Sequence, residues 1–312
     1  MLSVSYWSSL YRFVILTNTY PSHDDGTVTG PVLATTVFSP ADPNTSFGGK
    51  TVIVTGANRG LGFEAALKFM ALDASRVILG VRDPIKGVTA KTTLEQMTGR
   101  EGVVEIWELD MDSYDSIQDF ARRAGSLHRL DVVVLNAGVL MYEHKESLYG
   151  WEQSLQTNVL STALLALLLL PLLKNASELA SEDHGRPVLQ FVSSGTYKHA
   201  VIAEEHRDMD NLFGYHSSDT QDFDGNNQYA VSKLFVMYVM QTLASIARSG
   251  NQATSDLWGS SLIQSSRLSP LTSGRLGEEL RKKIWSEVLE ALAKDLPNLA
   301  GILDRAGAVE VP

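Results

Sequence analysis

The stretch that decides the fold is KTVIVTGANRGLGFEAALKF, residues 50–69. It begins with a β-branched apolar run, passes through a glycine-rich turn and continues into an amphipathic segment. We expect a strand over 50–56, a turn over 55–62 and a helix over 63–73. A strand, a short turn and a helix in this order form the first unit of a parallel sheet with crossover helices.

The same alternation of short apolar runs and longer helical stretches continues towards the C-terminus. The short runs are apolar on both faces, which is typical of strands that helices cover on both sides. The pattern predicts an α/β fold, a Rossmann-type doubly wound parallel sheet in a single domain. Further strands are expected at 75–81, 102–110, 130–138 and 187–194. Further helices are expected at 83–99, 113–125, 151–173 and 275–296, and one more contains Tyr229.

Composition limits the partners and the compartment. With 312 residues, 44% of them apolar, the chain can bury one large core. The formal net charge of −10 and the lack of a basic stripe argue against nucleic acid as a partner. The sequence contains no cysteine, which excludes disulfides and thiolate nucleophiles and fits a reducing compartment, so we expect a cytoplasmic location.

Two stretches fall outside the alternating pattern. Residues 1–48 are rich in Ser, Thr, Pro and Asp without a sustained period, so we expect an N-terminal extension before one domain over 49–312. The run TALLALLLLPLL, residues 162–173, is about half as long as a membrane-spanning helix needs. It also contains Pro171, and we expect a buried helix there and no membrane span.

The turn TGANRGLG places Gly56, Gly60 and Gly62 between the first strand and the first helix. Glycine permits positive φ and lets a bulky pyrophosphate approach the main chain. The start of the helix offers free N–H groups and a partial positive charge to that phosphate. A glycine-rich turn without a ligand is the alternative, but its position between strand and helix favours dinucleotide binding.

In a dinucleotide-binding fold, the residue that reads the adenosine ribose lies roughly 20 residues after the glycine turn, at the end of the second strand. Arg82 occupies this place and Asp83 follows it. An arginine pairs with a 2′-phosphate, whereas an acid accepts hydrogen bonds from a free 2′-hydroxyl. Arg59, in the glycine turn, adds a second guanidinium. NADP(H) is therefore the expected cofactor; Asp83 leaves NAD(H) open, and a solvated surface charge is the other interpretation of Arg82.

Several further motifs follow the glycine turn in a fixed order. The whole set is TGANRGLG (55–62), Asp110 after the third strand, NAG (136–138), Asn158 in the long helix, Ser194 after the fifth strand and YAVSK (229–233). Over about residues 48–240 this set resembles the short-chain dehydrogenase/reductase family, in its retinol-dehydrogenase-like and carbonyl-reductase-like branch. The stretch GKTVIVTGANRGLGFEAA (49–66) is also similar to reductases of fungal secondary-metabolite pathways.

The resemblance implies a set of site residues within an NAD(P)-binding domain. The cofactor residues that it implies are Gly56, Asn58, Arg59, Gly60, Leu61, Gly62, Arg82, Asp110, Asn136, Ala137, Gly138, Tyr229 and Lys233. The catalytic residues that it implies are Asn158, Ser194, Tyr229 and Lys233. In the family the counterpart of Asn136 is largely structural, and Asn158 would position a water that links Lys233 to solvent. Ser194 is chosen over Ser193 because the family's serine ends the strand.

The chemistry of Tyr229 and Lys233 fits these roles. An oxygen that becomes an alkoxide needs a proton donor, and free tyrosine, with a pKa of about 10, exchanges protons poorly at neutral pH. Lys233 lies four residues on, on the same helical face, and its charge is expected to lower the pKa of Tyr229. Tyr229 would act as general acid in reduction and general base in oxidation, Lys233 could also hold the nicotinamide ribose, and Ser194 would orient the carbonyl. The alternative for Tyr229 and Lys233 is a plain surface pair on an amphipathic helix.

The segment between Ser194 and Tyr229 is long and acidic and contains His199, His206 and His216. The carboxylates and histidines follow no recognised ligand spacing, so no metal is expected. We expect a solvated flap over the substrate whose closure affects turnover.

The segment 248–275 departs from the family pattern. It has no Pro-Gly turn of the kind that follows a sixth strand in the family, so this C-terminal part is atypical or shortened, and activity is expected to be reduced. The leading function is an NADP(H)-dependent oxidoreductase that reduces a carbonyl, or oxidises an alcohol, on a hydrophobic small molecule. A non-catalytic dinucleotide-binding or scaffold protein is the alternative, and a structural partner subunit with an interface on helix 159–173 is a third. Because family members often associate through this helix and the Tyr229 helix, a homodimer or homotetramer is expected.

Overall fold

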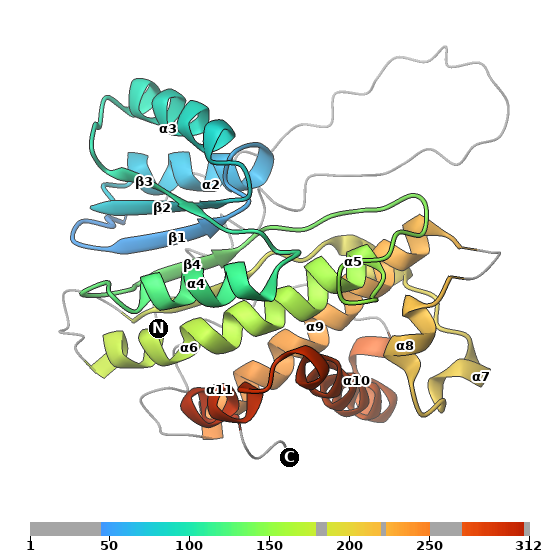
Figure 1. The fold of residues 1–312 in the computed structure, drawn as a ribbon. Helices are drawn as coiled ribbons and strands as arrows, with labels where there is room; N and C mark the ends of the chain where they lie inside the picture. Colours follow the sequence, from blue (N-terminus) through green and yellow to red (C-terminus); the bar gives the residue numbers. More distant parts are fainter. Residues whose placement is uncertain (1–44, 179–185, 220–222, 250–269, 309–312) are drawn as a thin grey trace, which may run out of the picture.

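The computed structural model describes residues 45–178, 186–219, 223–249 and 270–308. These residues form a five-stranded parallel sheet with helices on both of its faces (Figure 1). The predicted α/β fold is therefore confirmed. Nearly all of the expected extension 1–48, and most of the atypical segment 248–275, lie outside the described residues.

The strands follow the order β3-β2-β1-β4-β5, and every neighbouring pair is parallel. The chain builds outward from β1 to β3 and then returns to place β4 on the other side of β1. The ends of β1 and β4 thus form the switch point at which doubly wound sheets bind ligands. The bounds, all within the predicted ranges, are β1 Thr51–Thr55, β2 Arg76–Val81, β3 Val104–Glu108, β4 Val132–Leu135 and β5 Val188–Phe191.

Each face of the sheet has its own helical layer. One face packs against α2 and α3, and the other against α4, α6 and α9 (Figure 1). Neighbouring residues of β1 show this packing, because Val52 and Val54 belong to the core under α2 whereas Ile53 belongs to the core under α6. The bounds are α2 Gly60–Ala71, α3 Pro84–Thr98, α4 Tyr114–Ala124, α6 Thr162–Glu178 and α9 Gly225–Ser249.

Local sequence signals set the ends of α3. The carboxylate of Asp83 accepts hydrogen bonds from the backbone N–H groups of Ile85 at 2.9 Å and Lys86 at 3.2 Å, and Pro84 occupies the first helical position. The helix ends at Gly99, whose φ of 67° lies in the left-handed region. Oδ1 of Asp83 therefore serves as the helix cap.

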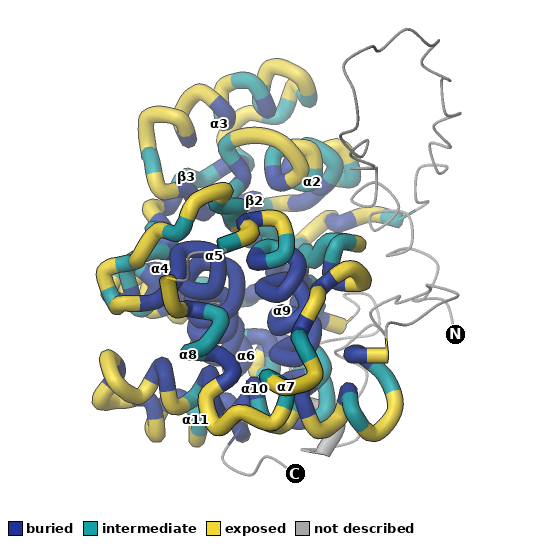
Figure 2. The backbone as a smooth tube through the Cα atoms, turned by 90° about the vertical axis from the view of Figure 1, so that its right-hand side faces the viewer, coloured by how far each residue is buried: buried dark blue, intermediate teal, exposed yellow. Residues whose placement is uncertain are grey.

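The long helix expected over 151–173 consists of three consecutive helical segments. They are α5 Gln153–Leu155, the π-helical η1 Gln156–Ser161, and α6. By length and composition, Gln153–Ser177 and Gly225–Ile246 could each cross a membrane, but 72% and 78% of their apolar windows are buried inside the protein. Figure 2 shows α6 and α9 buried along most of their length, so both serve as central helices of the core.

Two C-terminal helices, α10 Gly274–Asp295 and α11 Leu299–Ala306, form a further layer against α6 and α9 (Figure 1). Ile284 and Val288 of α10 have no exposed surface and share one core cluster with the leucines of α6. This layer covers one side of the leucine-rich helix 159–173, which was expected as an interface, with the same chain. The expected homodimer or homotetramer stays a prediction.

The segment between Ser194 and Tyr229 is also different from the solvated flap that the sequence predicts. It forms η2 Gly195–His199, α7 Glu204–Arg207 and α8 Leu212–Ser217. Leu212 and Phe213 are buried, and their backbone N–H groups donate to the buried carboxylate of Glu287 in α10, at 3.2 and 2.6 Å. The segment is anchored because its apolar residues find a partner surface that a local pattern cannot show.

Candidate active site

A cleft of about 880 Å³ opens at the C-terminal edge of the sheet, from Arg82 after β2 to Tyr229 and Lys233 on α9. Apart from Gly62, every cofactor residue predicted from the sequence lines it, and so does Ser194. The predicted residues at the cleft are Gly56, Asn58, Arg59, Gly60, Leu61, Arg82, Asp110, Asn136, Ala137, Gly138, Ser194, Tyr229 and Lys233. The fold thus gathers residues that lie far apart in the sequence.

The glycine turn forms a cradle that suits a pyrophosphate. Gly56 and Gly60 have φ values of 65° and 58°, which other residues rarely adopt. Helix α2 begins after Arg59 without a side-chain cap, so its first turn presents free N–H groups to the cleft. A Cβ on Gly62 would lie 2.5 Å from Nδ2 of Asn136 and 2.6 Å from the carbonyl oxygen of Gly56. Gly62 therefore serves the close packing behind the turn.

Asn136 ties β4 to β1 directly behind this cradle. Its Nδ2 donates to the carbonyl oxygen of Thr55 at 2.9 Å. The hydroxyl oxygen of Thr55 accepts hydrogen bonds from the backbone N–H groups of Asn136 and Ala137, both at 2.9 Å. This arrangement agrees with the structural role that the family resemblance implies for Asn136.

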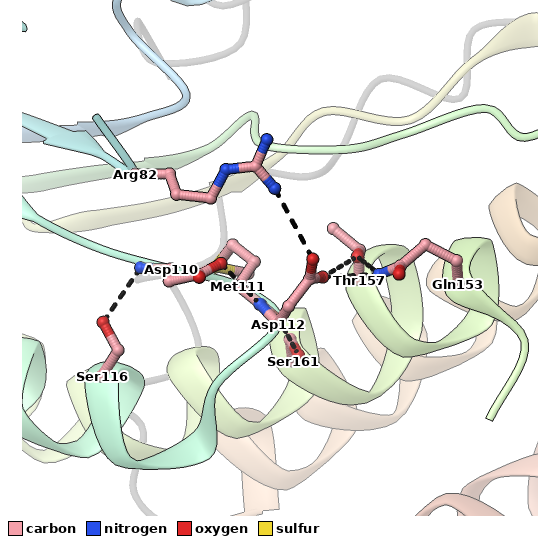
Figure 3. Close-up of polar contacts among 8 residues, drawn as sticks. All are labelled: Arg82, Asp110, Met111, Asp112, Ser116, Gln153, Thr157 and Ser161. Carbon is pink, nitrogen blue, oxygen red and sulfur yellow. Dashed lines mark hydrogen bonds and ion pairs between the residues drawn. The ribbon is translucent and has the colours of Figure 1, made fainter. Parts of the chain in front are cut away.

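Charged residues surround the end of the cleft near β2 (Figure 3). The side chain of Arg82 is 71% exposed, and its Nη1 lies 3.6 Å from Oδ2 of Asp112. Asp110 is held in place because its backbone N–H donates to Ser116 Oγ at 2.9 Å and its Oδ1 accepts from the N–H of Asp112 at 3.0 Å. Arg59 is exposed beside the cleft and makes no ion pair with any residue that the structure describes.

At the other end of the cleft, Ser194 faces Tyr229. Ser194 caps η2 after β5. Burial raises the pKa of the Tyr229 phenol, and the nearby side chain of Ser194 works against this rise. Ser193 also lines the cleft, but its hydroxyl donates to the backbone carbonyl of Lys233 at 3.4 Å. Ser194 is thus the serine beside the phenol, and its catalytic role stays a prediction.

Lys233 is buried beneath this pair. Its Nζ donates to the carbonyl oxygen of Val192 at 3.3 Å and lies 5.6 Å from the centroid of the Tyr229 ring. Burial lowers the pKa of Lys233 to about 8. Burial also raises the pKa of Tyr229 above its ordinary value. The expected lowering of the Tyr229 pKa by the charge of Lys233 is therefore not seen in this structure, where desolvation dominates the shift.

Asn158 lies in the π-helical turn and joins two parts of the site. Its Nδ2 donates to Val139 O and to Ser232 Oγ, both at 2.9 Å, and its Oδ1 accepts from the N–H of Val139 at 2.8 Å. A Cβ on Gly138 would lie 3.0 Å from Asn158 Oδ1 and 3.2 Å from Lys233 Nζ. The absence of a side chain at Gly138 thus lets the NAG turn, η1 and α9 approach one another closely.

The sequence reasoning missed two carboxylates that organise this region. Asp112 contacts Arg82 at one end of the cleft. Glu152 is fully buried and accepts from the side chain of Gln228, the residue before Tyr229, at 2.8 Å. Glu152 also caps α5 by accepting from the N–H groups of Ser154 and Leu155. An acidic residue directly before a helix was the available signal for Glu152; no local signal marks Asp112.

The histidines between Ser194 and Tyr229 do not gather with carboxylates. No group of three or more His, Asp or Glu side chains able to hold a metal occurs among the described residues. Burial lowers the pKa of His216 to about 4, so this ring is neutral at physiological pH.

The chain is similar to known short-chain dehydrogenases in sequence and in fold. The family profile described as short chain dehydrogenase matches residues 50–201. A short-chain dehydrogenase/reductase of Aspergillus flavipes is 36% identical over 320 residues, covering 86% of this chain and 93% of that protein. One of Phaeosphaeria nodorum is 43% identical over 205 residues, but the match spans only 65% of this chain and 59% of that protein. A crystal structure of an uncharacterised protein from Mycobacterium paratuberculosis shares the fold, with 21% identity and a TM-score of 0.51 over 86% of this chain and 97% of that one.

Proposed function

Because this chain belongs to the short-chain dehydrogenase/reductase family, we propose that it is an NADP(H)-dependent oxidoreductase that reduces a carbonyl, or oxidises the corresponding alcohol, on a hydrophobic small molecule. The observation that carries the proposal is the convergence of Ser194, Tyr229 and Lys233 at one end of a cleft whose other end begins with the glycine cradle. A bound nicotinamide dinucleotide would supply or accept the hydride there.

The cradle of Gly56 and Gly60 would hold the pyrophosphate against the first turn of α2. Lys233 would hold the nicotinamide ribose by hydrogen bonds from its ammonium group. Asp110, Ala137 and Gly138 would form the walls between these two ends. Each of these residues lines the cleft. Side chains in place of the glycines would leave less room for the pyrophosphate beside the main chain.

The preference for NADP(H) rests on charge at the adenosine end. Arg82 and Arg59 offer exposed guanidinium groups that suit a 2′-phosphate. Asp83, the acid that left NAD(H) open, also lines the cleft, but its Oδ1 caps α3 and its Oδ2 lies 3.6 Å from Nζ of Lys86. Titration of the protein with NADPH and with NADH tests the preference, and equal or tighter binding of NADH would overturn it.

Proton transfer would be the work of Tyr229. Its raised pKa keeps the phenol protonated at neutral pH, so it is ready to give its proton to the carbonyl oxygen while the carbonyl carbon accepts the hydride. Ser194 would hold that oxygen next to the phenol. In the oxidation direction the phenolate would have to form first, which its raised pKa makes harder; reduction is therefore the proposed direction at neutral pH.

Exposed apolar side chains support a hydrophobic substrate. Tyr142 and Val201, 65% and 66% exposed, lie on segments that lead out of the cleft from Val139 and Ser194. The similarity of residues 49–66 to reductases of secondary-metabolite pathways and the fungal origin of the relatives support a substrate from fungal secondary metabolism. Loss of NADPH absorbance with a panel of ketones and quinones tests the function, and no turnover with any of them would count against it.

A second candidate is a dinucleotide-binding protein with little or no turnover. It is favoured by one observation: within the described residues the sheet ends at β5, so no sixth strand of the family type adjoins the nicotinamide end. Reduced activity from the atypical segment 248–275 is part of the same proposal. Normal NADPH binding without turnover in the same assay would favour this candidate, and rates typical of the family would exclude it.

We also propose that the protein acts in the cytoplasm, a compartment that a chain without cysteine suits. A fluorescent fusion followed by microscopy tests this location, and signal confined to a membrane or an organelle would overturn it.

A further inference from the structure

The carboxylate of Asp112 is fixed on one side by hydrogen bonds. Its Oδ1 accepts from Thr157 Oγ1 at 2.9 Å and from Gln153 Nε2 at 2.6 Å (Figure 3). Gln153 Nε2 and Thr157 Oγ1 are themselves 3.1 Å apart. Both partners are nearly fully buried in the helical segment that carries Asn158, so Asp112 has little freedom to move.

The other oxygen of Asp112 faces the cleft and meets Arg82. Oδ2 lies 3.6 Å from Nη1 of Arg82, and both side chains line the cleft. The partners differ in how they are held, since the Asp112 side chain is 26% exposed and bound by two donors whereas the Arg82 side chain is 71% exposed. An ion pair with such an exposed arginine is weak, so Arg82 can leave it.

We propose that Asp112 determines cofactor selectivity by competing with the 2′-phosphate of NADP(H) for Arg82. This inference rests on the proposed function, which assigns Arg82 to that phosphate. A 2′-phosphate that pairs with Arg82 must share the guanidinium with the Asp112 carboxylate or displace it, and in either case it meets that fixed negative charge nearby. A free 2′-hydroxyl carries no charge and does not need Arg82, so binding of NAD(H) does not break the pair. Asp112 therefore narrows the preference for NADP(H) that Arg82 alone would give.

A purely structural role for Asp112 predicts something different. If its carboxylate only anchored the loop after β3 to Thr157 and Gln153, its replacement would affect both cofactors alike. Asp112→Asn separates the two roles, because the amide oxygen can still accept from both donors while the negative charge facing Arg82 is lost.

The test measures binding of 2′,5′-ADP and 5′-AMP by calorimetry, since these two probes differ only in the 2′-phosphate and need no turnover. We expect Asp112→Asn to tighten 2′,5′-ADP by about threefold, the scale of one exposed ion pair, and to leave 5′-AMP nearly unchanged. Asp119→Asn is the matched control, because it removes an equivalent carboxylate paired with Arg122 on α4, away from the cleft. The control should change neither affinity.

The same measurements with Arg82→Gln and with the double variant complete the cycle. Arg82→Gln should weaken binding of 2′,5′-ADP but not of 5′-AMP. Adding Asp112→Asn to this variant should not increase the affinity for 2′,5′-ADP relative to that for 5′-AMP. Suppose that Arg82→Gln weakens binding of 2′,5′-ADP, but Asp112→Asn tightens binding of both probes equally or of neither. The proposed competition by Asp112 is then wrong, while the role of Arg82 stands. If Arg82→Gln leaves the ratio of the two probes unchanged, the NADP(H) assignment fails as well. The oxidoreductase activity itself is tested separately, by turnover.

Discussion

The ammonium nitrogen of Lys233 lies 5.6 Å from the centroid of the Tyr229 ring, and both side chains line the cleft. Burial acts on both groups in the direction that disfavours charge, raising the pKa of the phenol and lowering that of the ammonium group to about 8. At neutral pH the tyrosine therefore carries its proton and the lysine is still mostly charged. This state suits proton donation to a carbonyl oxygen.

Tyr229→Phe should abolish most turnover because it removes the proposed proton donor and leaves the ring. A general acid typically contributes about 10²- to 10⁴-fold, and we expect a loss of kcat on that scale. NADPH binding, measured by fluorescence titration, should be close to that of the wild type. Undiminished turnover in a folded, cofactor-binding variant would contradict the proposed mechanism.

Ser194→Ala and Ser193→Ala form a matched pair. Only Ser194 faces the hydroxyl of Tyr229, whereas Ser193 donates a long hydrogen bond to a backbone carbonyl. We expect Ser194→Ala to lower kcat by about 10²-fold, the scale of a lost donor to the reacting oxygen, and Ser193→Ala to cause a much smaller loss. Steady-state rates with one reactive ketone compare them, and the reverse order would exchange the roles of the two serines.

Lys233→Met should remove both turnover and the contribution of Lys233 to the pH dependence of stability. In the wild type the folded pKa is lowered from 10.5 to about 8, so between these pH values the unfolded chain binds more protons than the native protein. The free energy of unfolding should then rise by on the order of 3 kcal/mol across this window, at about 1.4 kcal/mol per pKa unit.

In the Met variant this rise should be absent, since no group titrates at that position, and activity should be lost. Urea denaturation at a series of pH values measures the slope. An unchanged slope in Lys233→Met would show that the wild-type pH dependence comes from another group.

Glu287→Ala should loosen the segment between Ser194 and Tyr229. The change removes the acceptor for the N–H groups of Leu212 and Phe213, and an unsatisfied buried group costs about 1–3 kcal/mol. We expect a lower free energy of unfolding and faster proteolysis near α8. Glu290→Ala, at an exposed position of the same helix, is the control and should change little. Equal protease resistance of both variants would mean that the segment is anchored by other contacts.

Sedimentation distinguishes the expected homodimer or homotetramer from a monomer of 34.1 kDa, and the monomer is favoured by α10 and α11, which cover one face of α6 and α9. Burial of residues such as Ile284 and Val288 against these helices leaves no room there for a second copy. The measurement is best made over a range of protein concentrations. A stable dimer would show that association uses a different surface or displaces the C-terminal layer.

Much of the site was predictable because its signals are local. Gly56 and Gly60 had to be glycine for their positive φ, and the strand before them and the helix after them follow from apolar periodicity. The spacing of Tyr229 and Lys233 by four residues places them on one helical face wherever the helix packs. Their joint identification nevertheless depended on the ordered motifs shared with a known family, since each residue alone has an ordinary alternative.

Other features depend on contacts between distant segments. The pKa of Tyr229 is set by how deeply α9 is buried, which the spacing to Lys233 does not reveal. The segment with three histidines has the composition of a surface loop, yet Leu212 and Phe213 enter the core because α10 lies beside them.

The sequence by itself determined the order of strands and helices, the phosphate-binding turn and the residue types available for proton transfer, because backbone conformation and helical periodicity are properties of neighbouring residues. Tertiary structure alone decided that Asp112 meets Arg82 and that the C-terminal helices cover α6 and α9. Burial and charge pairing depend on which segments, distant in the sequence, pack against each other. No single stretch of the sequence specifies that packing.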